Sequence, residues 1–179
     1  DLTVGDCAFH DNYTVEDIPF VLPGVQEGIG GGAIGVVLFS TPAITNSVFE
    51  GNESRAGLGG AVSSSFGNTT SISGCEFRGN HSALSGGAVA VHALPALFGG
   101  APSSLTMTGS TLEHNSADLT GGAALCTEGS SLTITACDFT QNSVSGIGPS
   151  VANGGPIVVR EGGSVGATGC AFTGNTASG

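Results

Sequence analysis

Residues 75–89 read CEFRGNHSALSGGAV, and both ends of this stretch recur along the chain. It opens on an F-x-x-N motif, from Phe77 to Asn80. It closes on a Gly-Gly-Ala motif followed by an aliphatic residue, from Gly86 to Val89. A short pattern that recurs at a fixed spacing is typical of a solenoid, in which each repeat is one turn of the chain. The repeat therefore points to a solenoid before composition is considered.

Copies of the two motifs alternate over nearly all of the 179 residues. The F-x-x-N copies, with Leu in place of Phe in the fourth, end at Asn12, Asn52, Asn80, Asn115, Asn142 and Asn175. The Gly pairs begin at Gly31, Gly59, Gly86, Gly121 and Gly154. From a Gly pair to the next Asn the distance is 21 residues, except for one copy at 29, whereas the distance from each Asn to the next pair varies. This indicates invariant strands with insertions collected on one edge.

When the copies are aligned on the Asn, apolar and small residues occupy alternate positions. Three residues before the Asn stand Phe9, Phe49, Phe77, Leu112, Phe139 and Phe172. Five residues before it stand Cys7, Ser47, Cys75, Ser110, Cys137 and Cys170. A period of two predicts short strands with one face inward, and stacked copies bury a core that no single copy could bury. We predict an all-β fold, a parallel β-helix of about six coils with three short strands per coil, as one domain over residues 1–179.

Two aligned columns have a structural interpretation. An Asn amide both donates and accepts hydrogen bonds, so the Asn column predicts a buried ladder between successive coils. The Phe column predicts rings stacked at about 4.8 Å, the spacing of neighbouring strands. Neither column is counted among the candidate site residues.

Charge and hydropathy exclude several classes of function. The chain has 3 basic and 14 acidic residues and a net charge of −11, so it has no electrostatic footprint for nucleic acid or an anionic membrane surface. Its most apolar stretch, from Ile29 to Ile44, is interrupted by Gly and Pro and is too short for a spanning helix. We expect no nucleic-acid partner and no membrane insertion by this segment.

With both motifs in hand, the chain resembles the polymorphic outer membrane protein repeat family of chlamydial type, which is defined by G-G-A-[ILV] and F-x-x-N. The resemblance covers nearly the whole chain. It implies a right-handed parallel β-helix, secreted or on the cell surface, that acts as a structural stalk or in adhesion. We therefore expect a non-enzymatic extracellular protein with no cofactor, and with surface glycans among its partners.

The ends of the sequence suggest that the stack continues. The chain begins and ends inside the repeat, and neither end carries a polar helix or another capping element. Solenoids need capped ends, because a bare end coil exposes strand edges and an open apolar core. We expect residues 1–179 to be a fragment of a longer extracellular protein, continued by other subunits or domains.

The five cysteines are predicted to be buried thiols, namely Cys7, Cys75, Cys126, Cys137 and Cys170. Only Cys137 and Cys170 occupy one column in adjacent coils, so they are the candidate disulfide, and the alternative is a small thiol packed in the core. Cys7 and Cys75 are separated by a whole coil and lie beyond disulfide reach. Zinc-type Cys/His spacing is lacking, so we expect no metal site.

Four N-x-[S/T] sequons begin at Asn12, Asn52, Asn68 and Asn80. Three of these residues belong to the predicted ladder. Asn68 lies outside it, in a connection rich in Ser and Thr. Asn68 is therefore the one expected glycosylation site, in a eukaryotic source.

Two other functions remain open. Glu50, Arg78 and Glu113 stand two residues before the Asn on the outward side, which would suit a β-helix carbohydrate-active enzyme, either a polysaccharide lyase or a hydrolase. The alternative is a row of surface charges of little energetic weight.

A third function, ice binding, is suggested by outward Thr and Ser residues. Seven residues before the Asn stand Gly5, Thr45, Ser73, Thr108, Thr135 and Thr168, and Thr106 and Thr133 partly double this column. Outward Thr is also favoured on strands in general.

Insertions break the fixed spacing at three places. Residues 13–29, 143–153 and roughly 92–102 are predicted to protrude as loops. If a partner binds laterally, we expect contacts there, because recognition residues concentrate on loops over a rigid scaffold.

Overall fold

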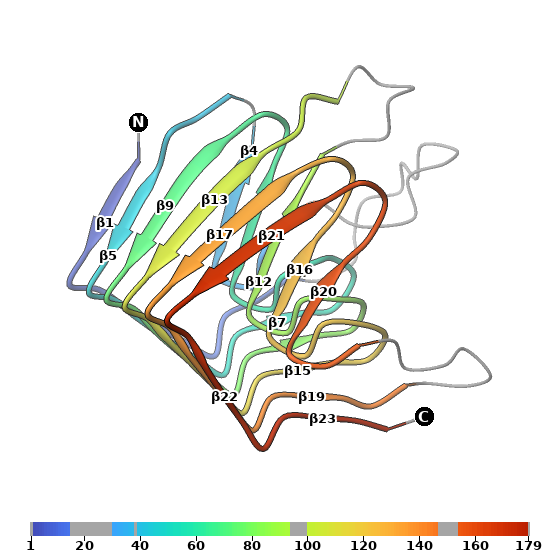
Figure 1. Ribbon diagram of the computed structural model, residues 1–179. Helices are drawn as coiled ribbons and strands as arrows, with labels where there is room; N and C mark the ends of the chain where they lie inside the picture. The colour runs from blue at the N-terminus through green and yellow to red at the C-terminus, as the bar shows by residue number, and fades with distance from the viewer. Residues whose placement is uncertain (1, 15–29, 38, 94–99, 147–153, 179) are drawn as a thin grey trace.

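The computed structural model describes residues 2–14, 30–37, 39–93, 100–146 and 154–178, which form short strands wound into a coil (Figure 1). In these ranges every regular element is a strand, and all strand pairs in the sheets are parallel. Seen from the C-terminal end, the chain runs counterclockwise as it advances toward the viewer, so the coil is right-handed (Figure 1). The predicted right-handed parallel β-helix of about six coils is confirmed.

The strands form four sheets, to which successive coils contribute one strand each. Sheet A contains β1 (Thr3–Gly5), β5 (Ala43–Thr45), β9 (Thr69–Ser73), β13 (Ser104–Thr108), β17 (Ser131–Thr135) and β21 (Ser164–Thr168). Sheet B contains β2 (Ala8–His10), β6 (Val48–Glu50), β10 (Glu76–Arg78), β14 (Thr111–Glu113), β18 (Asp138–Thr140) and β22 (Ala171–Thr173). Sheet C contains β3 (Tyr13–Thr14), β7 (Glu53–Ser54), β11 (His81–Ser82), β15 (Ser116–Ala117), β19 (Ser143–Val144) and β23 (Thr176–Ala177). Sheet D contains β4 (Ile34–Val37), β8 (Val62–Ser65), β12 (Val89–His92), β16 (Ala124–Cys126) and β20 (Ile157–Val159).

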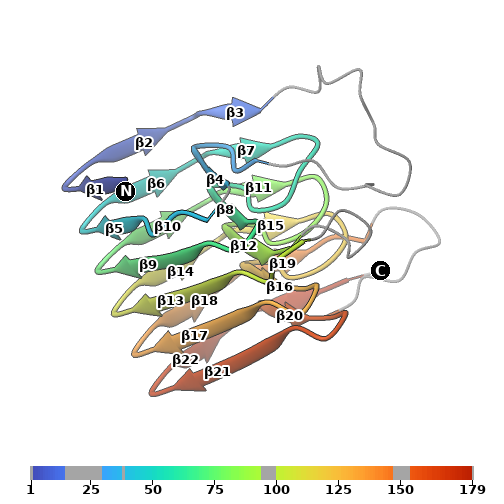
Figure 2. The same cartoon turned by 90° about the horizontal axis from the view of Figure 1, so that it is seen from above.

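The register of the stack follows the alignment on the Asn. Phe77 lies opposite Phe49 in the preceding coil and opposite Leu112 in the next. Figure 2 shows the strands of sheet A side by side in chain order. One coil therefore corresponds to one sequence repeat.

The number of strands per coil is four, and the prediction of three was wrong. The missed element is the two-residue strand of sheet C that follows each Asn, such as β11. Two residues are too few to display a period of two, so the sequence pattern does not reveal this strand.

The bounds of the strands also correct the predicted loops. Residues 13–14 and 143–144 form β3 and β19, and His92 ends β12, so the loops predicted over 13–29, 143–153 and roughly 92–102 begin too early. The rest of these insertions lies mostly outside the described residues.

The predicted Phe column lies in the core, together with aliphatic residues of sheets A and D. Phe49 and Phe77 are fully buried, and their ring centroids lie 4.8 Å apart with the planes inclined by 6°. Phe9 stacks on Phe49 at 4.9 Å, and Phe139 on Phe172 at 5.0 Å. The predicted Phe stack is confirmed, with Leu112 filling its one substituted place.

The Asn column forms the predicted ladder. The Oδ1 atom of Asn80 accepts hydrogen bonds from the backbone N–H and the side-chain Nδ2 of Asn52, at 3.0 and 2.9 Å. The Nδ2 atom of Asn80 donates to the Phe49 carbonyl and to Asn115 Oδ1, both at 2.9 Å. Asn80 is fully buried, and each of its side-chain hydrogen-bonding groups has a partner.

The Gly pairs mark the closest approach between coils. Gly86 has a φ of +70°, which disfavours other residues. A Cβ atom on Gly87 would lie 2.1 Å from the Gly122 carbonyl oxygen and 2.6 Å from that of Ser116. The first Gly therefore supplies a left-handed turn, and the second lets two backbone segments pass without a side chain between them.

Burial of all five thiols was predicted, and this is wrong for two of them. Cys75, Cys126 and Cys137 are buried, whereas Cys7 is exposed and Cys170 is half-buried. Cys7 and Cys170 lie in the first and last coils, which are covered on one side only.

The candidate disulfide between Cys137 and Cys170 is not formed, and both residues are free thiols, which was the stated alternative. Their Sγ atoms instead donate hydrogen bonds to the carbonyls of Thr135 and Thr168, at 3.4 and 3.5 Å. Stacked parallel side chains give poor disulfide torsions. Burial raises the pKa of the Cys137 thiol, which keeps it protonated and unreactive.

Candidate functional site

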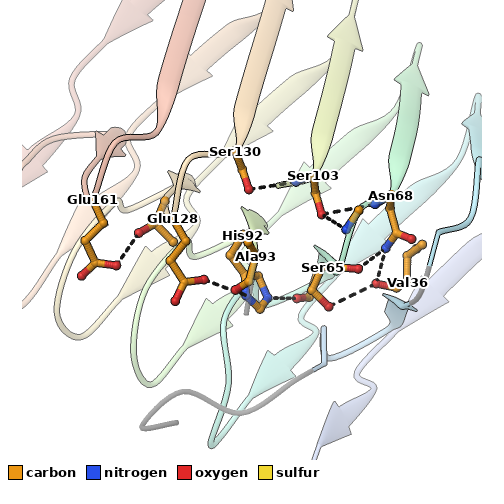
Figure 3. Close-up of polar contacts among 12 residues, drawn as sticks. Val36, Ser65, Asn68, His92, Ala93, Ser103, Glu128, Ser130 and Glu161 are labelled. Carbon is orange, nitrogen blue, oxygen red and sulfur yellow. Dashed lines mark hydrogen bonds and ion pairs between the residues drawn. The ribbon is translucent and has the colours of Figure 1, made fainter. Parts of the chain in front are cut away.

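A buried polar cluster lies on the outward side of sheet D, centred on His92 at the end of β12 (Figure 3). His92 is 4% exposed. Its Nε2 atom lies 3.1 Å from the Ser63 hydroxyl of β8, and its Nδ1 atom lies 3.3 Å from the Ala93 carbonyl oxygen. With the proton on Nδ1, the ring donates to Ala93 and accepts from Ser63, which satisfies both nitrogens of a neutral imidazole.

Burial lowers the pKa of His92 to about 4, and the positive charge of Arg160 acts in the same direction. The hydrogen bond to the Ala93 carbonyl opposes this shift. A carboxylate oxygen of Glu128 lies 3.9 Å from Nδ1, too far for a hydrogen bond. His92 is therefore neutral at pH 7.

The Ser63–His92 pair matches the nucleophile–base half of a hydrolase triad in distance alone. Ser63 is 1% exposed, so its hydroxyl does not meet solvent in this state. Its geometry describes a satisfied buried hydrogen bond on the outer side of the sheet.

The low pKa of His92 makes stability depend on pH. In the unfolded chain the pKa of His92 is near 6.5, so the unfolded state binds a proton below that pH. In the folded state the ring binds this proton only near pH 4. We expect its contribution to stability to be complete above pH 6.5 and to fall by about 3 kcal/mol as the pH drops to 4. Urea denaturation of the wild type and of His92→Gln across this range measures the difference, since other groups titrate equally in both. Parallel pH profiles for the two proteins would contradict it.

Asn68 lies in a second interior polar row and not in an exposed connection (Figure 3). Its Nδ2 atom donates to the carbonyls of Val36 and Ser65 at 2.8 and 2.5 Å, and its backbone N–H donates to Ser103 Oγ at 3.3 Å. Ser103 N–H in turn donates to Ser130 Oγ at 3.0 Å. A glycan attached to Nδ2 of Asn68 would remove one of these two side-chain hydrogen bonds, so the folded chain disfavours the glycosylation that the sequence suggested.

The row could have been found in the sequence. The residues twelve positions before each ladder Asn are all small or polar, namely Ser40, Asn68, Ser103, Ser130 and Gly163. The backbone N–H of Ser40 donates to Asn68 Oδ1 at 2.8 Å, which extends the row by one coil.

The candidate enzymatic residues are brought together but are exposed. Arg78 lies in register between Glu50 and Glu113, as expected. However, its guanidinium pairs with Glu76 at 2.5 Å, and Glu50 pairs with His10 at 3.3 Å. These side chains are about half exposed, and ion pairs in such places contribute at most about 1 kcal/mol. The arrangement is a solvated charged face.

The outward side of sheet A contrasts with this charged face. Its positions carry Thr, Ser, Gly or Ala and, over the strands of the sheet, no charged residue. The three central strands, β9, β13 and β17, present only hydroxyls, from Thr69, Ser71, Ser73, Ser104, Thr106, Thr108, Ser131, Thr133 and Thr135. We call these nine residues the hydroxyl face.

Comparisons with known proteins return no match to a family model, to a curated protein or to a solved structure. Within the described ranges, no group of three or more His, Cys, Asp and Glu is arranged to hold a metal ion. The same residues include no helix with the length and apolar character needed to cross a membrane.

Proposed function

We propose that this chain is a non-enzymatic structural or adhesive β-helix segment of a secreted or cell-surface protein. The observation that carries the proposal is the continuity of the interior. The Asn ladder and the Phe column, with Leu112 in one place of the column, run from the first coil to the last. The described coils therefore share one cross-section and one kind of core, as in a rod. A rod of this kind can hold what is joined to its two ends at a fixed distance, and its outer faces are available to bind ligands.

The two ends of the rod support stacking on a partner. Phe172 in the last coil is 48% exposed, whereas its equivalents Phe49 and Phe139 are fully buried. Among the described strands, β1 and β21 each pair with one neighbour only, so each leaves one edge unpaired. Apolar faces and open strand edges favour further β-strands as the occupant. The proposed partner is therefore another set of coils, from a second subunit or domain.

Self-association tests this proposal. At rising concentration the chain should form end-to-end species, because its own coils offer the same strand edges and apolar end faces as the proposed partner. Phe172→Lys should weaken this association by placing a charge on the end face, whereas Thr111→Lys on sheet B in the middle of the stack should not. Sedimentation equilibrium measures both. A chain that stays monomeric at every concentration, with both ends bare, would contradict the stacking role.

The extracellular location and the adhesive role rest on the resemblance of the repeat, and the net charge of −11 is compatible with both. Protease added outside intact source cells should remove the segment from the parent protein. Protection until the cells are lysed would contradict a surface location.

A further inference from the structure

The hydroxyl face is a regular two-dimensional array. In β9, β13 and β17 the outward residues are in register, so that Thr106 lies directly between Ser71 and Thr133. Outward residues along one strand are about 6.6 Å apart, and neighbouring strands are about 4.8 Å apart. The nine hydroxyl-bearing residues therefore form three rows of three on a nearly rectangular grid.

The grid is held stiffly from behind. On the inward side of the same strands, Ile72, Met107 and Ile134 are each 1% exposed. The strands are also joined by backbone hydrogen bonds over their full lengths. Five of the nine outward residues are Thr with β-branched side chains, among them Thr106 and Thr133, and these have few rotamers. The backbone of the face is thus held in place, and its Thr hydroxyls have few positions open to them, without a bound ligand.

The absence of charge on this face is selective. The chain has 14 acidic residues, and on sheet B charged groups occupy outward positions in most coils, among them Glu50, Arg78 and Glu113. In sheet A the outward positions at which the pattern lacks a hydroxyl are Gly5, Ala43 and Gly166, all outside the three central strands. The face is therefore kept neutral as well as regular.

We propose that the hydroxyl face binds ice, independently of the stacking role proposed above. Hydroxyls at fixed spacing can hydrogen-bond an ordered layer of water, and the Thr methyl groups restrict the orientations of the water between them. Charged side chains would disrupt such a layer, because ions keep their own hydration shells and are rejected by the ice lattice.

A pair of matched substitutions tests the proposal. Thr106→Lys places a charge at the centre of the hydroxyl face. Thr111→Lys makes the same substitution at an exposed position of sheet B, between Glu76 and Asp138. In dilute buffer the wild type and Thr111→Lys should show thermal hysteresis and enter a slowly grown ice crystal. Thr106→Lys should lose most of the hysteresis and stay in the liquid.

Circular dichroism and thermal unfolding verify that the variants are folded, and Thr133→Lys on the next strand replaces Thr106→Lys if the latter fails to fold. A wild type that shows no hysteresis and is excluded from ice overturns the proposal. So does a folded Thr106→Lys with unchanged hysteresis. Retention on crystalline cellulose without hysteresis would assign the same face to a solid polysaccharide and would also overturn it.

Discussion

Replacing Gly87 with alanine should destabilise the folded chain by about 4 kcal/mol or more, enough to prevent folding at ambient temperature in a protein of ordinary stability. The new methyl group would lie 2.1 Å from the Gly122 carbonyl oxygen and 2.6 Å from the Ser116 carbonyl oxygen. Both obstacles are backbone atoms in the next coil, so neither can move aside as a flexible side chain could. Urea and thermal denaturation measure the loss.

The matched control is Gly155→Ala, in the last Gly pair. Gly155 occupies the same place in the repeat, but a Cβ atom there meets nothing within 4 Å. We expect this substitution to change the free energy of unfolding by less than about 1 kcal/mol. Equal effects of the two substitutions would show that the close approach of the coils is not what requires glycine.

Asn80→Ala should cost about 4 kcal/mol, because it removes one rung from the middle of a buried ladder. The change leaves the backbone N–H of Asn52, the amide of Asn52, the Phe49 carbonyl and Asn115 Oδ1 each with one partner fewer. A buried polar group that loses its hydrogen bond costs about 1–3 kcal/mol. Chemical denaturation gives the total.

Asn175→Ala provides the comparison for this rung. Asn175 bonds to Asn142 and to the Phe139 carbonyl, but it lies in the last coil and is partly exposed. Water can replace its bonds there, so the loss should be less than half of that for Asn80→Ala. If the ladder did not stabilise the fold, the two substitutions would lower the free energy of unfolding by small and equal amounts.

The sequence predicts the stack and its register well, for a physical reason. A buried Asn that bonds to the next Asn, such as Asn80 to Asn115, must keep its place in every coil, so its spacing records the register directly. The Phe stack depends on the same spacing. Both are periodic contacts between equivalent residues, which a sequence alignment of the chain with itself can detect.

Features that depend on non-equivalent residues could not be predicted in this way. Ser63 and His92 lie in neighbouring coils but two positions apart in the repeat, because His92 is in register with Ser65. Their contact requires knowledge of how the outer side of sheet D is covered. The exposure of Cys7 likewise depends on what lies beyond the first coil and not on its column.

The Asn ladder has a direction, and this restricts how copies can join. In every bond between two ladder Asn residues, the Asn of the earlier coil donates through its backbone or amide N–H and the Asn of the later coil accepts through Oδ1, as between Asn12 and Asn52 and between Asn142 and Asn175. A coil that continues the ladder after Asn175 must bring an acceptor, and one that continues it before Asn12 must bring donors. Two identical ends, both offering donors or both offering acceptors, cannot complete each other's hydrogen bonds. Association through the ladder is therefore head-to-tail, and such a heterologous contact grows an open filament instead of closing a symmetric dimer.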